Sequence, residues 1–403
     1  MKARRRKING SPTSNTTVDR HAAVVRIQWG AQEMECAWIA GEPAALDAAV
    51  AEAAQLLASS RHPLIAGLGT DVAGARAAVA LAERIGAAID HMHADELLRN
   101  LDVMRSSGVL RTTPSEAHVR ADTLLLVGPG LGETWPELPQ RLFGAMQRSQ
   151  HAGAVERRIY WICPGRDLAI SSSGKMTAVA IGKELAELPS LLATLRARLA
   201  SRPIGKTPIS SRMLNEVANG LKGARYGVAV WSAAALDALT VEMLCGLVED
   251  LNTATRFSGL PLAPADNAVG VMQACAWVTG LPMRIGFGRG FPEHDPWLFE
   301  SRRLVASGET DCVLWISAYR AVAPAWQMGS PTIALTGRDA NFRVPPRVHI
   351  AVGRPGVDHN GVEHLRSIGT LALVEAKEPT DTISVADAIA RIVAILPAGG
   401  QAC

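Results

Sequence analysis

The sequence lacks cysteines at the paired spacing that metal sites use. Its six cysteines stand far apart, and most of them lie inside apolar segments; they are Cys36, Cys163, Cys245, Cys275, Cys312 and Cys403. A Cys₄ zinc site or an iron–sulfur cluster needs closely spaced thiols, so the spacing excludes one built from this chain alone. We interpret these cysteines as small core hydrophobes of a protein from a reducing compartment.

Long apolar runs and a strong excess of one charge are lacking as well. No uninterrupted apolar run reaches the length of a membrane-spanning helix. The formal net charge is only +3, and the one dense group of basic residues is MKARRRK at the N-terminus. A nucleic-acid-binding protein would gather such residues on one face. We therefore expect neither a membrane nor a nucleic acid as partner.

The N-terminal segment also lacks the hydrophobic centre of a signal peptide, because the polar stretch INGSPTSNTT follows the basic residues. We expect residues 1–41 to form a disordered arm and a small hairpin that pairs 24–27 with 35–39 around Gly30. The protein is accordingly expected in the cytoplasm.

The residues that are present are typical of a large α/β protein. A chain of 403 residues is too long for one ordinary domain, and it is 48% hydrophobic and 20% charged. Pro63 opens the apolar run LIAGLG, which is followed by the helical pattern AGARAAVALAERIG and a second apolar run from Ala87. A strand, a helix and a strand in this order predict a parallel sheet.

The same alternation continues along the chain. Further strands are predicted at 123–127, 158–163, 227–232, 311–317, 331–336 and 348–352. Helices are predicted at 44–58, 178–200, 210–222, 234–251, 267–279 and 384–396. The pattern predicts two doubly wound, Rossmann-like parallel sheets, in which ligands bind at the carboxyl ends of the strands.

Two glycine-rich turns follow predicted strands. The segment from Gly67 to Gly74, GLGTDVAG, resembles a dinucleotide fingerprint, but its third glycine comes two positions late and Asp90 is a weak substitute for the usual acidic residue. A plain tight turn is the alternative. The segment GPGLG, which contains Gly128 and Gly130, could admit a phosphate but lacks the Lys-Ser/Thr of a P-loop.

Two groups of titratable residues also have two interpretations each. His91 and His93, with Asp90 and Asp95, could bind zinc from one face of a strand, or they form a polar strand end. The segment 293–295, Glu-His-Asp, could be an acid–base cluster, or it consists of caps in a loop between prolines. Five tryptophans are interpreted as core and interface anchors: Trp231, Trp277, Trp297, Trp315 and Trp326.

Read in order, several segments resemble the B subunit of formylmethanofuran dehydrogenase, a member of the molybdopterin oxidoreductase superfamily. They include WIAGEPAALDAAV, HPLIAGLGTDVAGARAAVALAERIGAAID, ADTLLLVGPG, LNTATRFSGLPL and PGVDHNGVEHLRSIGTLALV. The most specific is NAVGVMQACAWVTGLPMRIGFGRGFPEHDPW, which is similar to the family pattern W-x-T-G-x-P…F-x-R-G-x-P. The resemblance covers about 38–375.

The departures from the family pattern concern the cofactors. The family's N-terminal cysteines for a [4Fe–4S] cluster are missing, since the first forty residues contain only Cys36. The position of the cysteine or selenocysteine that binds tungsten or molybdenum is Glu96, and the family's Pro-Arg reads Pro136-Glu137. Both changes oppose binding of the family's bis-molybdopterin guanine dinucleotide, because soft metals prefer thiolates and phosphates prefer guanidinium groups.

These losses resemble the B subunits of bacterial formyltransferase/hydrolase complexes of methylotrophs. In such complexes a formyl group passes from tetrahydromethanopterin to a methanofuran-type carrier and is released as formate. The resemblance implies a structural subunit without catalytic residues, metal or cofactor, partnered by an amidohydrolase-type subunit, a formyltransferase subunit and a C subunit. It also implies a vestigial pterin cleft, whose expected residues are Glu96, Gly128, Gly130, Arg256, Asn267 and Arg289.

The resemblance also implies a domain layout. One α/β domain, 91–265, is inserted into another made of 42–90 plus 266–375, with 376–403 as a C-terminal helix and tail and no N-terminal iron–sulfur domain. Composition alone would divide the chain into two consecutive halves. In the cleft so formed, the segment 293–295 becomes polar lining, and Arg289 pairs with a neighbouring carboxylate.

Two other functions stay open. The first is an active molybdenum- or tungsten-pterin formylmethanofuran dehydrogenase subunit that uses Glu96 as an unusual ligand. The second is a separate nucleotide-binding protein that uses the turns at Gly67 or Gly128.

Overall fold

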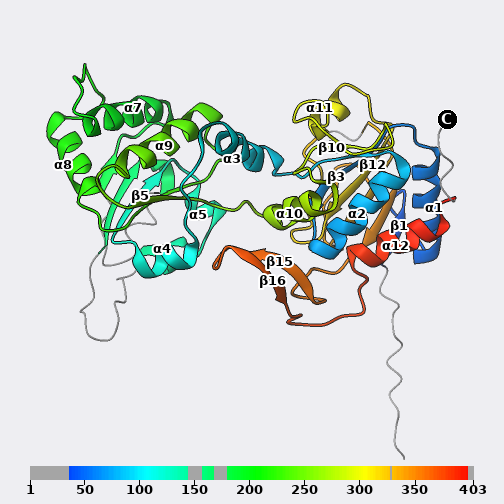
Figure 1. Cartoon of the computed structure of the whole chain (residues 1–403). Coiled ribbons are helices and arrows are strands. Elements are labelled where there is room, and N and C mark those ends of the chain that lie inside the picture. The colour runs from blue at the N-terminus through cyan, green and yellow to red at the C-terminus, as the bar shows by residue number, and fades with distance from the viewer. Residues whose placement is uncertain (1–35, 144–156, 168–178, 327–328, 398–403) are drawn as a thin grey trace, which may run out of the picture. The chain divides into compact units, whose positions relative to one another are not determined.

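The computed structural model describes residues 36–143, 157–167, 179–326 and 329–397. Their strands form three sheets, of nine, five and two strands (Figure 1). Helices alternate with the strands of the two larger sheets, so the chain has a mixed α/β fold with parallel sheets. No described helix combines the length and the apolar character that crossing a membrane requires.

The five-stranded sheet is parallel throughout. Its strand order is β7 (Val179–Ile181), β6 (Arg158–Ile162), β5 (Thr123–Val127), β8 (Gly227–Trp231) and β9 (Phe257–Pro261). Alternate residues of β5 face opposite sides, so Leu125 packs among the helices α7 to α9 and Leu124 packs on the side of α4 and α5. These helices are α4 (Pro114–Arg120), α5 (Leu131–Thr134), α7 (Leu188–Leu199), α8 (Ser211–Lys222) and α9 (Ala238–Leu251).

The nine-stranded sheet has a parallel centre and antiparallel edges. The parallel strands are β4 (Ala88–Ile89), β3 (Pro63–Gly69), β12 (Cys312–Ser317), β13 (Thr332–Thr336) and β14 (Val348–Ala351). One edge continues antiparallel through β10 (Ile285–Gly286) to β11 (Glu293–His294), and the other through β1 (Ala37–Ile39) to β2 (Glu42–Pro43). β3 and β5 therefore belong to different sheets.

Four helices pack against one face of the nine-stranded sheet and form the largest core with it. They are α1 (Leu46–Ser59), α2 (Val72–Ile85), α10 (Ala268–Thr279) and α12 (Val385–Ile395). α1 and α12 come from opposite ends of the chain and lie side by side (Figure 1). On the other face, Trp315 packs against Leu304 and Val305 of α11 (Ser301–Ala306).

The remaining elements are one long helix, one hairpin and three short helical turns. The helix α3 (Ala94–Ser107) packs against α9 and α10, and β15 (Gly361–Leu365) pairs with β16 (Thr370–Val374) in the two-stranded sheet. The short turns are η1 (Pro139–Phe143), η2 (Gly165–Asp167) and η3 (Leu185–Glu187).

Most predicted elements in the described residues are confirmed, but four points of the prediction are wrong. The predicted helix 178–200 begins with the strand β7, and helix starts only at Leu188, next to Pro189 in its first turn. The nine-stranded sheet has antiparallel strands at both edges, whereas the five-stranded sheet is parallel as predicted. The histidines at 91 and 93 follow β4 in a turn rather than lying on a strand, and 293–294 forms the strand β11 rather than a loop.

The helix α3 and the strands β9, β15 and β16 were not predicted. The proposed hairpin partner 24–27 lies outside the described residues, whereas Ala37–Ile39 pairs with β2 and β14.

Candidate functional site

A buried carboxylate lies between α10 and the carboxyl ends of β3 and β12. The side chain of Asp266 is completely buried. Its Oδ2 lies 3.1 Å from His93 Nε2, and Arg320 donates to the carboxylate through Nε at 2.9 Å and through Nη2. His93 Nδ1 lies 3.1 Å from Glu96 Oε1. We call these four side chains, with His91, the Asp266 cluster.

The opposite charges of the Asp266 cluster stabilise one another, whereas its two cations approach each other, with Arg320 Nη2 3.1 Å from His93 Nε2. Burial alone would raise the pKa of Asp266, but hydrogen bonds from His93 and Arg320 and their positive charges lower it to about 2. Burial would also lower the pKa of His93, but hydrogen bonds to Asp266 and Glu96 and their negative charges raise it to about 9. The cluster therefore contains two cations and two anions at neutral pH.

His91 stays neutral beneath this network. Its burial and the positive charge of His93 lower its pKa to about 4. Its Nδ1 accepts a hydrogen bond from the backbone N–H of His93 at 3.0 Å, so Nε2 carries the proton and donates to the Asp266 carbonyl at 3.1 Å. Both ring nitrogens are used, which leaves neither of them for a metal ion.

Glu96 reaches the cluster because it lies in the first turn of α3. Acidic side chains are favoured there by the exposed N–H groups and the dipole of the helix. Its side chain is only 15% exposed and forms an ion pair with His93. The residue that the resemblance aligns with the family's thiolate is therefore engaged by another side chain of this protein.

The structure places the other residues of the expected cleft in different roles. Asn267 follows Asp266 directly, with its Nδ2 donating to Thr70 O at 2.9 Å and its Oδ1 accepting from the N–H of His364 at 2.8 Å. Gly128 and Gly130 have φ of +77° and +81° and follow the carboxyl end of β5, where the Gly128 carbonyl accepts from Trp161 Nε1.

The two arginines expected in the vestigial pterin cleft lie away from the carboxyl end of β5. Arg256 is exposed and precedes β9, so it lies at the amino end of the parallel sheet, opposite Gly128. Arg289 is 75% exposed and pairs with Glu293 at 3.1 Å, which confirms a carboxylate partner but places the pair in solvent.

The two aspartates considered as zinc ligands beside His91 are engaged in ion pairs with an arginine instead. Asp90 and Asp95 both bind Arg284, and Asp90 also accepts from the N–H of Ser301 at 2.9 Å. Burial raises the pKa of Asp90 to about 6. In the part of the chain that the structure describes, no group of three or more histidine, cysteine, aspartate or glutamate residues is arranged to hold a metal ion.

The segment 293–295 does not form an acid–base cluster. Its three side chains act separately: Glu293 pairs with Arg289, His294 Nδ1 contacts the carbonyl of Met283 at 2.5 Å, and Asp295 accepts from the N–H groups of Trp297 and Leu298. These residues belong to the edge hairpin and its following turn rather than to the Asp266 cluster.

The first glycine turn is explained by packing. A Cβ atom at Gly67 would lie 2.5 Å from the carbonyl oxygen of Ile316, so the neighbouring strand requires glycine there. Asp71 caps α2 by accepting from the N–H of Gly74 at 2.9 Å. A carboxylate therefore occupies the helix N-terminus where a pyrophosphate would bind.

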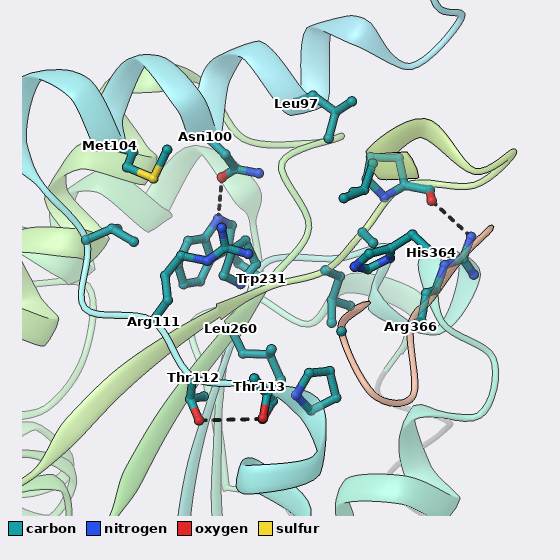
Figure 2. A pocket seen from close by; sticks show the side chains of 18 of the residues that line it. Leu97, Asn100, Met104, Arg111, Thr112, Thr113, Trp231, Leu260, His364 and Arg366 are labelled. Atoms are coloured by element: carbon teal, nitrogen blue, oxygen red, sulfur yellow. Dashed lines mark hydrogen bonds between the residues drawn. The ribbon is translucent and has the colours of Figure 1, made fainter. Parts of the chain in front are cut away.

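A cavity of about 490 Å³ lies elsewhere, on the other side of α3. Residues of α3, the segment 109–116, the ends of β8 and β9, α10 and the hairpin β15–β16 line it (Figure 2). The buried indole of Trp231 forms one wall, and its Nε1 donates to Asn100 Oδ1 at 3.0 Å. None of the six residues expected for the vestigial cleft lines this cavity.

The titratable lining of the cavity is mainly basic. Arg366 donates to the carbonyl oxygens of Thr134 at 2.8 Å and Pro264 at 3.1 Å. Burial lowers the pKa values of Arg111, His364 and Arg366, and for His364 the charges of both arginines add to the effect. The sequence did not reveal this group, because its members come from two segments that lie far apart in the chain and share no local pattern.

The tryptophans divide between core and surface. Trp231 and Trp315 are buried, whereas Trp277 is 67% and Trp297 is 68% exposed. The latter two are therefore not core residues, and the interpretation as interface anchors stays a prediction.

No protein-family model matches the chain. One similar protein is the B subunit of the formyltransferase/hydrolase complex Fhc of Methylorubrum extorquens, with 36% identity over 375 residues, which are 91% of this chain and 99% of that protein. The B subunit of the tungsten-containing formylmethanofuran dehydrogenase 2 of Methanocaldococcus jannaschii is 27% identical over 292 residues, 68% of this chain and 64% of that protein.

A solved structure is similar as well. It is a crystal structure of the formyltransferase/hydrolase complex FhcABCD from Methylorubrum extorquens with methylofuran. One of its chains matches with a TM-score of 0.78 and 36% identity, covering 89% of this chain and 98% of that chain.

Proposed function

The chain belongs to the family of B subunits of formyltransferase/hydrolase complexes, and we propose that it is a structural subunit of such a complex. Its partners are the formyltransferase subunit, the amidohydrolase-type subunit and the C subunit. The complex transfers a formyl group from tetrahydromethanopterin to a methanofuran-type carrier and releases formate in the cytoplasm. The chain itself contributes no catalytic residue, metal or pterin.

The observation that carries this proposal is the ion pair of Glu96. A carboxylate is a poor substitute for the thiolate that a tungsten or molybdenum centre requires. Glu96 is also bound to His93, which is held in turn by the buried Asp266. To act as a metal ligand, Glu96 would have to give up its ion pair with His93, which would leave the partly buried His93 cation with Asp266 as its remaining carboxylate partner.

The arginines expected to bind the phosphates of a pterin dinucleotide are not in position to do so either. Arg256 lies at the opposite end of its strand and Arg289 pairs with Glu293 in solvent, so neither guanidinium faces Gly128 or Gly130. A pterin dinucleotide needs cations near its phosphates. The residues present therefore do not match the molybdopterin cofactor of the dehydrogenases.

The inserted-domain layout is part of the same proposal. The membership of the sheets supports it, since strands from 63–89 and 285–351 share the nine-stranded sheet and strands from 123–261 make the five-stranded sheet. A chain with two large sheets offers several faces to partner subunits, and Trp277 and Trp297 are large apolar side chains on such faces.

The deciding experiment measures metal and pterin in the co-purified complex. We expect tungsten and molybdenum far below one atom per copy of this chain and no fluorescent pterin after oxidation. About one atom of either metal per copy, with pterin, would contradict the proposal and favour the dehydrogenase.

A variant of Glu96 further distinguishes a structural subunit from an active dehydrogenase subunit. Glu96→Gln keeps the size of the side chain but removes its charge. We expect no formate-dependent dye reduction in the parent complex or the variant, and unchanged formyl hydrolysis by the assembled variant. Dye reduction that is present in the parent and lost in Glu96→Gln would identify Glu96 as a ligand.

A further inference from the structure

The cavity beside α3 has the size and the walls of a ligand site. About 490 Å³ lies within the range of small-molecule pockets. Its walls are largely apolar, with Leu97, Leu101 and Met104 on one face of α3 opposite Leu260 and Leu262. The indole of Trp231, which forms another wall, is buried and held by a hydrogen bond to Asn100.

A positive charge in the cavity has no partner of its own. In the described residues, no hydrogen bond or ion pair engages the guanidinium of Arg111, an exposed residue that lines the solvent-accessible side of the cavity (Figure 2). The one acidic residue of the lining, Glu116, is already neutralised by Arg120, which donates to it at 2.6 Å. Arg366 adds a second cation, so the lining has an excess of positive charge.

The backbone around Arg111 is held in place by hydrogen bonds, although the Arg111 side chain itself has no partner. Its neighbours bind the free edge of β9: the N–H of Thr112 donates to Gly259 O at 3.0 Å, and the N–H of Gly259 donates to Leu110 O at 2.6 Å. A guanidinium presented by a fixed backbone loses less entropy when it binds an anion. Gln273 adds a buried side-chain oxygen without a hydrogen-bond partner.

We propose that this cavity binds a small organic anion, with its carboxylate or phosphate at Arg111 and an apolar body between α3 and the end of β9. A guanidinium group pairs with either acid through two parallel hydrogen bonds. The apolar walls favour a flat hydrocarbon or heteroaromatic part. Where that part is heteroaromatic and carries an N–H, the oxygen of Gln273 accepts a hydrogen bond from it. This site does not depend on the proposed role in the complex.

The test is calorimetric titration of the purified complex with three probes. We expect 2-naphthoate to bind with a Kd below about 1 mM. The neutral 2-naphthamide should bind at least about tenfold more weakly, because it cannot form the charged pair. Inorganic phosphate, which lacks the apolar body, should give no saturable binding. Equal affinity for the acid and the amide would overturn the proposal, and tighter binding of phosphate than of naphthoate would do the same.

Variants assign the binding to this cavity rather than to a partner protein. Arg111→Gln should weaken naphthoate at least about tenfold and leave naphthamide unchanged, and Arg111→Lys should restore part of the affinity. Arg105→Gln is the matched control, since Arg105 lies on α3, pairs with Asp102 and does not line the cavity. Naphthoate binding that survives Arg111→Gln, or that falls equally in Arg105→Gln, would place the anion elsewhere.

Discussion

At the scale of single residues, the Asp266 cluster shows how a buried charge is tolerated. Asp266 is fully buried, yet it has a histidine and an arginine within hydrogen-bond distance. Burying two charges as a pair is often neutral for stability, whereas removing one partner is costly because the other stays buried. The cluster is therefore sensitive to the loss of any member.

The first prediction concerns His93 and pH. Its pKa is raised from 6.5 to about 9 by Asp266 and Glu96, so its contribution is complete below about pH 6.5 and is lost as the pH rises through 9. His93→Gln should cost about 2 kcal/mol at pH 6.5 and much less at pH 9.5. Thermal unfolding of both proteins at several pH values measures this difference.

Three other members of the cluster, Arg320, Asp266 and His91, keep their protonation state over this pH range and serve as the reference for this experiment. Arg320 stays charged over this range, Asp266 has a pKa of about 2, and His91 titrates near 4. None of them titrates between pH 6.5 and 9.5. A stability difference between His93→Gln and the parent that is constant over this range would show that His93 is not protonated in the folded protein.

The second prediction concerns Gly259, which makes room for Trp231. A Cβ atom at Gly259 would lie 2.8 Å from the indole ring. Gly259→Ala should therefore displace the ring and lower the free energy of unfolding by about 1–3 kcal/mol. Gly205→Ala is the control, because nothing lies within 4 Å of a Cβ atom there. Equal melting temperatures of the two variants would contradict this role.

The sequence could predict some of these residues but not their partners. Glu96 was found only because the family resemblance gave its position a meaning. Asp266 bonds His93 across 173 positions of the chain and Arg320 across 54, and such contacts leave no periodic pattern in one sequence. Arg111 carries no local signal either, because its role depends on the neighbouring edge of β9.

At the scale of elements, Asn267 joins three of them. It begins α10, binds the carbonyl of Thr70 after β3 and accepts from the N–H of His364 in β15. Its φ of 55° lies in the left-handed region, which asparagine tolerates better than most residues. One side chain thus links the hairpin β15–β16 to α10 and to the end of β3, in addition to the packing of β15 against α2 and α10.

The third prediction follows from this attachment. Asn267→Ala and Asn267→Gly both remove the two hydrogen bonds, but only alanine is strained at φ of 55°. We expect Asn267→Ala to be about 1 kcal/mol less stable than Asn267→Gly. Both should increase hydrogen exchange at the amide of His364, as measured by mass spectrometry. Unchanged exchange in both variants would show that the hairpin is held by other contacts.

Elements with a clear local pattern were predicted well, and those that depend on tertiary contacts were not. The apolar strands β5 and β12 are complete runs of buried residues. β9 contains Gly259 and ends at Pro261, so its sequence reads as a turn, and it forms because β8 pairs along its whole length. The helix α3 was missed because the two histidines before it favoured a strand interpretation.

At the scale of the whole molecule, the exposed tryptophans lead to the fourth prediction. Trp277 on α10 is 67% exposed, and tryptophan is enriched among residues that dominate binding at protein interfaces. Trp277→Ser should weaken the retention of a partner protein in the complex by about tenfold or more and leave the melting temperature of the chain unchanged. Co-purification at graded dilution measures the retention.

A smaller exposed side chain provides the control. Val119 on α4 is 57% exposed, and Val119→Ser should not change retention. If Trp277→Ser releases no partner, Trp277 is not part of an interface in the complex.

The order of strands in the nine-stranded sheet has a consequence for biosynthesis. β3 ends at Gly69, but its neighbour β12 begins only at Cys312. At ordinary rates of translation, the apolar strand β3 waits roughly 10–50 s on the ribosome with an open edge. The five strands between Thr123 and Pro261 can pair during that interval. The nascent chain is therefore most exposed to aggregation, and most dependent on chaperones, before its last quarter has been made.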